Sequence, residues 1–548
     1  MGTQTAGATT AARGVLVTLA ASQFLMTLDS SVMNVSMATV AADLGTTITG
    51  VQTAITLYTL VMATTMLTGG KIGTIIGRRR AFALGCVIYG AGSLVTGLAP
   101  NLAVLLLGWS LLEGLGAALI MPAVVALVAA NFTQRDRPRA YGTVAAAGAV
   151  AVAVGPLVGG AATTYLSWRV VFFAEVVVVA LVLVLSRAVA DVPGDRAARL
   201  DLVGTVLSVL GLGTAVLGVL RSSEWGWVAP KPGGPELAGL SPTFWCLVVG
   251  ALVVWVFLRW EALLARRGGD PLVRLEMFTH PELTGGLLMF FLQFLLQAGV
   301  FFVVPLYLSV VLELPALDTG LRILPLSVTL LLAAAGIPRL WPRASPRRVV
   351  RVGVALLLLG ILVLMSGIRL DSSAAVVAVP LSLVGLGVGA LSSQLGAVTV
   401  SAVPVEQGGE VGGLQNTATN LGASLGTALA GSVLIAALSA TLAAGVHDNP
   451  DVPQAVRDRA GVELAAGVPF LSDTALEQAL ADADVAGATA RAIVAENRAA
   501  RVEGLDAALA TLALVAVGAL FATGRVPAAA GAGPAPGRAR RPRPAPAR

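Results

Sequence analysis

The stretch Gly69-Gly-Lys-Ile-Gly-Thr-Ile-Ile-Gly-Arg-Arg-Arg-Ala-Phe82 joins two long apolar runs. The residues that we single out as a candidate conformational-switch loop are Gly70, Gly73, Gly77, Arg78, Arg79 and Arg80. Arginines between two membrane spans are expected on the cytoplasmic side of a bilayer, and this accounts for the basic residues but not for the glycines. Glycine permits a tight turn and the close approach of two helices. The stretch therefore predicts a short cytoplasmic connection against which a neighbouring helix can press.

The chain around this connection has the composition of a polytopic membrane protein. Of its 548 residues, 56% are hydrophobic and 12% are charged, whereas soluble domains have about 25% charged residues. Fourteen apolar runs are long enough to cross a bilayer as helices. They lie at about 14–40, 51–70, 82–99, 102–130, 140–163, 170–189, 202–220, 243–262, 284–311, 320–340, 349–369, 375–400, 410–442 and 505–524. Because these runs do not alternate with polar residues, they exclude a transmembrane barrel.

Basic residues predict the orientation of these spans. With the N-terminus inside, most arginines fall in segments on the cytoplasmic side, and an even number of spans then places both termini in the cytoplasm. Between the last two spans, 474–480 and 488–502 can form short helices in an otherwise polar outside loop. The tail contains only Pro, Ala, Gly, Val and Arg, so it cannot bury a core and is expected to be disordered.

Metal, cofactor and nucleic-acid chemistry are excluded on composition. The chain has two cysteines, both inside apolar runs, and two histidines, which cannot make a zinc, haem or iron–sulfur spacing. The basic residues are scattered between apolar runs rather than gathered into a nucleic-acid-binding patch. No phosphate-binding loop of an ATP-driven pump occurs. We therefore expect no metal, no cofactor, no nucleic-acid partner and no enzyme activity.

Three carboxylates lie inside membrane runs: Asp29, Glu113 and Glu175. Placing a charged carboxylate at the centre of a membrane helix costs at least about 2.5 to 3.5 kcal/mol. Each of the three is therefore a candidate functional residue. Asp29 and Glu113 are both about 16 Å from the outer ends of their spans, and Glu175 is expected nearer the interface. A carboxyl in a low dielectric can load and release a proton near neutral pH. The alternative is a static carboxyl that only forms an interhelical hydrogen bond.

The fifth span predicts a smooth helical face. It contains the small and helix-bending residues Gly148, Gly155, Pro156, Gly159 and Gly160. Three of its glycines fall within about 40° of one another around the helix, so another helix can press into the groove. Proline can bend the span near its outer end. A static packing face is the competing explanation.

Polar residues at membrane depth are candidates for lining a central cavity. They are Asn34, Gln293, Gln297, Gln394, Gln415, Asn416 and Asn420. Interhelical hydrogen bonding explains them equally well.

Taken together, these motifs resemble the major facilitator superfamily, and specifically its fourteen-span drug:proton antiporters, which are bacterial multidrug and antibiotic exporters. The stretch 69–82 looks like the family's loop between spans two and three, and Gly155-Pro-Leu-Val-Gly-Gly160 like its antiporter motif. Four positions depart from the family pattern. Two of them are acids, because Glu113 stands where the family usually has Gln in span four and Glu175 where many relatives have Asn. Thr74 stands where the family usually has Asp in the loop, and Ser110 where it has Arg in span four. The acidic residue that the family uses in an ion pair between the two bundles is therefore missing from its usual place.

The resemblance implies an all-α integral membrane fold of two six-helix bundles plus two inserted helices. The expected segments are a cytoplasmic N-terminus (1–13), an N-terminal bundle (14–189), a linker with the two extra helices (190–283), a C-terminal bundle with an extracellular loop at 443–504 (284–524) and a cytoplasmic tail (525–548).

It also implies proton-coupled export of amphipathic, cationic or neutral drugs by alternating access. The expected partners are such a substrate, protons and the lipid bilayer of the bacterial cytoplasmic membrane, and the chain is expected to act as a monomer. Alternatives that stay open are a dedicated exporter of one endogenous metabolite or antibiotic and, in another class, a non-transporting membrane sensor or scaffold.

Overall fold

The computed structural model describes residues 2–528, except 47, 192, 196, 232–233, 315, 370–373, 405–406, 451, 455–469, 484 and 486. Within that part, every regular element is a helix, and an isolated bridge joins Leu237 to Leu240. Among the described residues, fourteen helical segments are long and apolar enough to cross a membrane, which confirms the number predicted from the apolar runs.

The first half contains seven labelled helices. They are α1 (Gly2–Asp43), α2 (Ile48–Ile76), α3 (Arg78–Gly97), α4 (Leu102–Leu105), α5 (Gly114–Asn131), α6 (Arg137–Tyr165) and α7 (Arg169–Ser186). A π-helical turn (Leu106–Glu113) joins α4 to α5, and the three together make one span. The six spans surround a common apolar core.

The second half begins after a 3₁₀ turn (Leu275–Thr279) and has its own apolar core. Its helices are α10 (Pro281–Leu306, continued by a π-helical turn, Tyr307–Val311), α11 (Ala316–Leu340), α12 (Pro346–Gly367), α13 (Ala378–Ser401), α14 (Gly408–Asp448), α16 (Asp473–Asp482) and α17 (Gly487–Ala522). Short 3₁₀ turns precede α13 (Ala374–Val377) and follow α17 (Thr523–Arg525).

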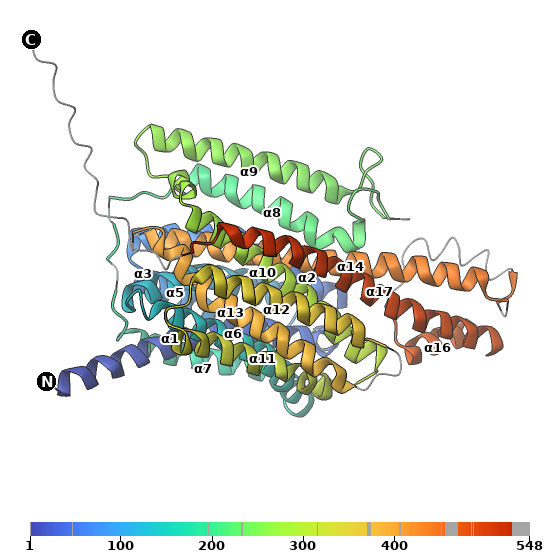
Figure 1. Cartoon of the computed structure of the whole chain (residues 1–548). Helices are drawn as coiled ribbons and strands as arrows, with labels where there is room; N and C mark the ends of the chain where they lie inside the picture. The colour runs from blue at the N-terminus through green and yellow to red at the C-terminus, as the bar shows by residue number, and fades with distance from the viewer. Residues whose placement is uncertain are drawn as a thin grey trace, which may run out of the picture.

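The two inserted helices are α8 (Leu202–Trp225) and α9 (Pro242–Arg266), and they lie outside both cores (Figure 1). α8 packs on α2 and α14, while α9 packs mainly on α8. In α9, 17% of the span is buried, as expected for a helix that faces lipid on most sides. The start of α1 and the end of α17 lie at the same end of the bundle (Figure 1), as an even number of crossings requires.

The helices expected at 474–480 and 488–502, within the loop predicted at 443–504, are present and are longer than expected. α14 continues through Asp448, and α17 begins at Gly487 and runs without interruption into the last span. Both helices project beyond the bundle, with α16 beside α17 (Figure 1). The projecting parts of α14 and α17 are rich in alanine and keep a helical period. Their polar residues therefore face solvent without ending the helices. Residues 455–469 of the loop and 529–548 of the tail lie outside the described residues.

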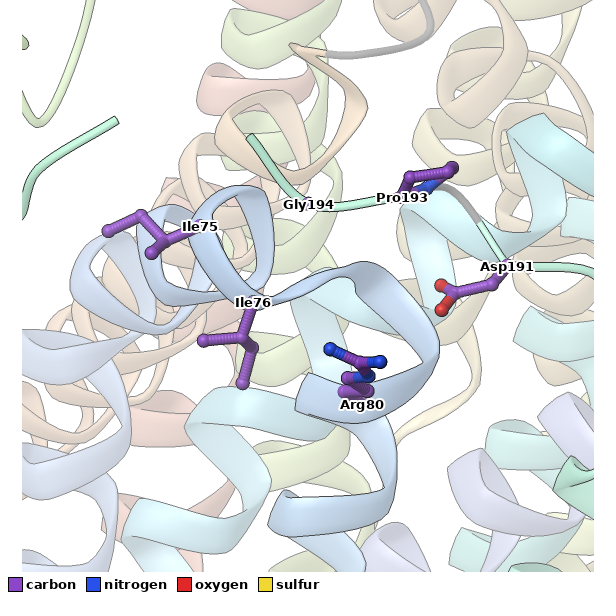
Figure 2. Close-up of a pocket in the computed structure, with 6 residues that line it drawn as sticks. All are labelled: Ile75, Ile76, Arg80, Asp191, Pro193 and Gly194. Carbon is purple, nitrogen blue, oxygen red and sulfur yellow. The ribbon is translucent and has the colours of Figure 1, made fainter. Parts of the chain in front are cut away.

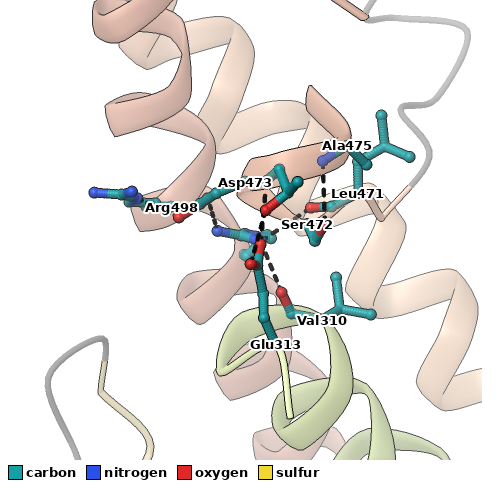
Figure 3. A network of polar contacts seen from close by, with 9 residues as sticks. Val310, Glu313, Leu471, Ser472, Asp473, Ala475 and Arg498 are labelled. Atoms are coloured by element: carbon teal, nitrogen blue, oxygen red, sulfur yellow. Dashed lines mark hydrogen bonds and ion pairs between the residues drawn. The ribbon is translucent and has the colours of Figure 1, made fainter. Parts of the chain in front are cut away.

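A polar network holds the projection onto the end of α10 (Figure 3). The buried Arg501 guanidinium pairs with Asp473 and donates to the carbonyls of Val310 at 3.1 Å and Leu471 at 3.0 Å. The Glu313 carboxylate accepts hydrogen bonds from the backbone and hydroxyl of Thr474 at 3.1 and 2.9 Å. These bonds hold the pKa of Glu313 below its usual range. The projection is therefore anchored to the C-terminal bundle.

Candidate functional site

The three membrane carboxylates, Asp29, Glu113 and Glu175, form one cluster. They come from α1, the π-helical turn and α7, and one carboxylate oxygen from each lies within 4.8 Å of those from the other two. All three side chains are buried. The expectation that Glu175 would lie nearer the interface is corrected, because α7 packs on α3 so that its side chain reaches the other two acids.

Trp109 positions Asp29. Its indole N–H donates to both carboxylate oxygens of Asp29, each at 2.9 Å. The indole stacks on the Tyr58 ring of α2 with centroids 5.0 Å apart and an interplanar angle of 1°. Trp109 lies four residues before Glu113, so the two side chains share one face of the turn. A tryptophan N–H in a membrane run needs an acceptor, and this is the sequence signal that could have revealed Trp109.

Two hydroxyls of α3 hold one oxygen of each glutamate. Thr96 donates to Glu113 Oε1 at 3.2 Å, and Ser93 donates to Glu175 Oε2 at 3.1 Å. Gly92 allows this approach, because a Cβ there would lie 2.6 Å from Cγ of Glu113. Within the described part of the chain, Glu113 Oε2 and Glu175 Oε1 have no hydrogen-bond partner.

The cluster has the chemistry of a proton site. A buried ionised carboxylate without a nearby cation is costly, and protonation removes that cost. Among the described residues, no ion pair joins these acids to a basic side chain. Ser110, at the family's usual arginine position, donates to the carbonyl of Ala54 at 2.8 Å. We predict no metal here, although the cluster is the one group with metal-site spacing found in the described ranges.

The predicted close approach at the glycine–arginine loop is confirmed. Gly77 has a φ of 97°, which glycine adopts readily, and α3 begins at the next residue. A Cβ on Gly70 would lie 2.5 Å from the carbonyl oxygen of Gly409 at the start of α14. α2 of the first half therefore touches α14 of the second half at backbone distance.

Glu410 supplies an acid for this contact that sequence reasoning missed. The Lys71 ammonium lies 3.8 Å from Glu410 Oε1 and donates to the carbonyl of Pro271 at 2.8 Å. The Arg274 guanidinium lies 4.0 Å from the same carboxylate oxygen. Lys71 and Glu410 are both buried. The acid absent at Thr74 is thus replaced from the other half of the molecule.

The three arginines of the loop have different surroundings. Arg78 donates to the carbonyl of Gly70 at 3.2 Å and to the hydroxyl of Thr74 at 2.8 Å, within the loop. Arg79 donates to backbone carbonyls that follow α7. Arg80 lines a surface pocket (Figure 2). A Cβ on Gly73 would lie 3.3 Å from Nη1 of Arg78, so this glycine leaves room for the Arg78 side chain.

The groove predicted on the fifth span is confirmed as a packing surface for α1. A Cβ on Gly155 would lie 2.2 Å from the hydroxyl oxygen of Ser31, and one on Gly159 would lie 3.1 Å from Cα of Val32. Gly148 faces Gln23, and Gly160 is half-buried. The side chains of Asn34 and Pro156 lie outside the described residues. Whether this face also moves stays a prediction.

The predicted cavity-lining amides are hydrogen-bonded in several ways. Their described bonds are Gln293 to Ser392, Gln394 to Ser393, Gln415 to Thr399, Asn416 to the Gly412 carbonyl and Asn420 to the Asn416 carbonyl. Asn420 also donates to the sulfur of Met66 across the two halves at 3.4 Å. Gln297 Oε1 is buried without a partner among the described residues. Their role as substrate contacts stays a prediction.

Comparisons with known proteins agree with this geometry. The model of the Major Facilitator Superfamily matches residues 19–427. The puromycin resistance protein pur8 of Streptomyces alboniger is 33% identical over 434 residues, which cover 78% of this chain and 83% of that protein. The multidrug resistance protein Stp of Mycobacterium tuberculosis is 30% identical over 79% of this chain and 77% of its own. The cephamycin export protein CmcT of Amycolatopsis lactamdurans is 31% identical over 77% of this chain and 85% of that protein.

A solved structure shares the fold. The human organic anion transporter MFSD10 (TETRAN) superposes with a TM-score of 0.56 at 15% identity, over 94% of this chain and 98% of that one. The relatives are transporters and not enzymes, and their bacterial sources and the fourteen spans indicate the plasma membrane. This chain belongs to the major facilitator superfamily and is a multi-pass transporter of small molecules.

Proposed function

We propose that the chain exports amphipathic antibiotics or drugs from the cell in exchange for protons, by alternating access. The names of its relatives support export of such compounds, since they include resistance and export proteins for puromycin, cephamycin and tetracenomycin C. The fold supports alternating access, because two helical bundles of this kind can rock about a site between them.

The buried carboxylate cluster carries the proposal of proton coupling. Asp29, Glu113 and Glu175 sit together without a counter-ion among the described residues, so at least part of the cluster is neutral when buried. Protons bind these acids from the outside and leave toward the cytoplasm. If a cationic substrate and a proton stabilise the cluster competitively, each lowers the affinity for the other, and this linkage couples the two fluxes.

The glycine-lined contact between α2 and α14 is the second element of the mechanism. In the orientation expected from the basic residues, this end faces the cytoplasm. The conformation described here is then closed on the cytoplasmic side, with Gly70 against Gly409 and Lys71 beside Glu410. Inward opening requires these residues to separate.

Proton release in inside-out vesicles tests the coupling. A pH gradient is established, and lipophilic cations and neutral drugs are added to wild type, Asp29→Asn, Glu113→Gln and Glu175→Gln. Glu276→Gln, which changes an exposed acid outside the cluster, is the matched control. We expect drug-dependent proton release in wild type and in the control, and its loss in Asp29→Asn and Glu113→Gln. Drug flux without proton flux in wild type contradicts antiport, and equal flux in all proteins contradicts a role for the acids.

A dedicated exporter of one antibiotic is the second candidate. It is favoured by relatives whose names each specify a single compound, such as the methylenomycin A resistance protein. The same vesicles separate the two, because a dedicated exporter responds to one compound of the panel and a multidrug exporter to several. A sensor or scaffold responds to none.

A further inference from the structure

A basic pocket lies between α3 and α7, away from the carboxylate cluster. It has a volume of about 450 Å³ and is lined by Arg79, Arg80, Ala83, Leu183, Ser186 and Arg187. Three of these six residues are arginines, and no acid is among them. Pockets of this size hold small-molecule groups.

The pocket continues toward a second one that shares Arg80. This neighbour has a volume of about 660 Å³ and is lined also by Ile75, Ile76, Asp191, Pro193 and Gly194. Figure 2 shows Arg80 on α3 across from the segment that carries Asp191. The Asp191 carboxylate accepts the backbone N–H of Arg79 at 2.8 Å. With one acid beside three arginines, the combined surface keeps a positive balance.

The arginines differ in how much of their charge is available. Arg79 donates to the carbonyls of Arg187 at 3.3 Å and Val189 at 3.4 Å, which fixes its guanidinium at the end of α7. Arg80 and Arg187 are exposed, and neither forms an ion pair with another described residue. Guanidinium groups present several donors in the geometry that phosphate oxygens accept.

The faces of α3 and α7 below the pocket are apolar and exposed. On α3, Leu84 and Val87 are 45% and 55% exposed, four and seven residues after Arg80. On α7, Val184 and Leu181 are 58% and 57% exposed, three and six residues before Arg187. Each pair lies on the same side of its helix as the arginine. α3 and α7 pack directly together, with Gly90 against Val179.

We propose that the basic pocket and the apolar helix faces below it bind an anionic phospholipid. The phosphate lies at Arg79, Arg80 and Arg187, and the acyl chains lie along the apolar faces of α3 and α7. The three arginines favour a headgroup of net negative charge, because the ammonium of a zwitterionic headgroup is repelled by them. The apolar faces of α3 and α7 favour a lipid over a free phosphate compound, because only a lipid has acyl chains that can cover Leu84 and Val184. This site does not depend on the transport mechanism proposed above.

Lipid binding to the purified full chain tests the site. The protein is held in a neutral detergent, phosphatidylglycerol or phosphatidylcholine is added, and bound lipids are counted by native mass spectrometry. The test variant is Arg80→Gln with Arg187→Gln, since neither side chain makes a described contact that the fold needs. The matched control is Arg139→Gln with Arg343→Gln, two exposed arginines that lie on α6 and in the turn between α11 and α12. Size-exclusion chromatography checks that each variant is folded.

We expect phosphatidylglycerol to bind wild type and control alike, and to bind the test variant about 25-fold more weakly, at about fivefold per arginine. Phosphatidylcholine should bind wild type more weakly than phosphatidylglycerol. Equal phosphatidylglycerol binding by all three proteins overturns the proposal. Displacement of the lipid by millimolar glycerol phosphate also overturns it, in favour of a soluble phosphate ligand. Because no transport is measured, failure of the export proposal leaves this result unaffected.

Discussion

Neutralising Glu410 should open the contact between the two halves. Its carboxylate lies 3.8 Å from the Lys71 ammonium, and both side chains are at most 1% exposed. Removing one partner of a buried ion pair costs about 3 to 5 kcal/mol, because the remaining charge is buried without its partner. Lys71 keeps its hydrogen bond to the carbonyl of Pro271, so Glu410→Gln should cost near the lower value. A cost of about 3 kcal/mol shifts a conformational equilibrium about 150-fold toward the separated state.

Electron–electron distance measurements can detect this shift. Spin labels at Arg139 and Arg343 report the end of the bundle that carries the loop, because α6 and α11 also meet there at Gly142 and Ala334. The labels require a background in which both native cysteines are replaced by alanine. We expect one dominant short distance in wild type and a larger population at longer distance in Glu410→Gln.

Two further variants decide the interpretation. Glu276→Gln removes an exposed acid near the same end and should leave the distances unchanged. Replacing Lys71 and Glu410 together by methionine should restore much of the short-distance population, because a buried pair exchanged for apolar side chains is often neutral. If Glu410→Gln has the wild-type distance distribution, the ion pair does not hold the halves together and the reasoning is refuted.

Three other perturbations follow from the packing. Gly155→Val should lower the thermal unfolding temperature through an overpacking cost of about 1 to 3 kcal/mol, since α1 lies at Cβ-contact distance, whereas Gly518→Ala, with nothing within 4 Å, should not. The Asp43 carboxylate accepts hydrogen bonds from the Arg169 guanidinium and the Trp168 indole at the start of α7. These bonds hold the pKa of Asp43 below its usual value. The wild type should therefore exceed Asp43→Asn in stability by up to about 1 kcal/mol above pH 4, and the difference should vanish as the pH falls further; a difference that grows in acid contradicts this. Arg501→Met should increase hydrogen exchange in α16, and unchanged exchange would show that the network does not anchor it.

The number and positions of the spans were predictable because bilayer thickness fixes the length of an apolar helix. The packing faces of Gly70 and Gly155 were also predictable, since only a missing side chain allows helices to meet at backbone distance. Such signals are local in sequence. Each can be read from a window of about twenty residues without knowing which helix lies opposite.

The partners of these residues were not predictable, because they come from distant parts of the chain. Glu410 stands at the edge of an apolar run, where an acid is ordinarily solvated, and its burial follows only from the docking of α14 on α2. Trp109 stands among apolar residues that it resembles in hydropathy. Its indole N–H needs an acceptor, but the sequence does not indicate that this acceptor is Asp29, 80 residues earlier in the chain.

α2 connects the carboxylate cluster to the contact between the halves. Near its start, Tyr58 stacks on Trp109, which in turn holds Asp29. Thirteen residues later, about 20 Å along the helix, Lys71 meets Glu410. All three acids belong to the N-terminal half, so a proton bound there can move the C-terminal half only through an element that touches both. A proton shifts the equilibrium only if it binds the two conformations with different affinity. α2 is one such element, because a displacement of α2 that separates Gly70 from Gly409 also displaces the stack of Tyr58 on Trp109. α5 and α6 are others, since each also contacts helices of the C-terminal half.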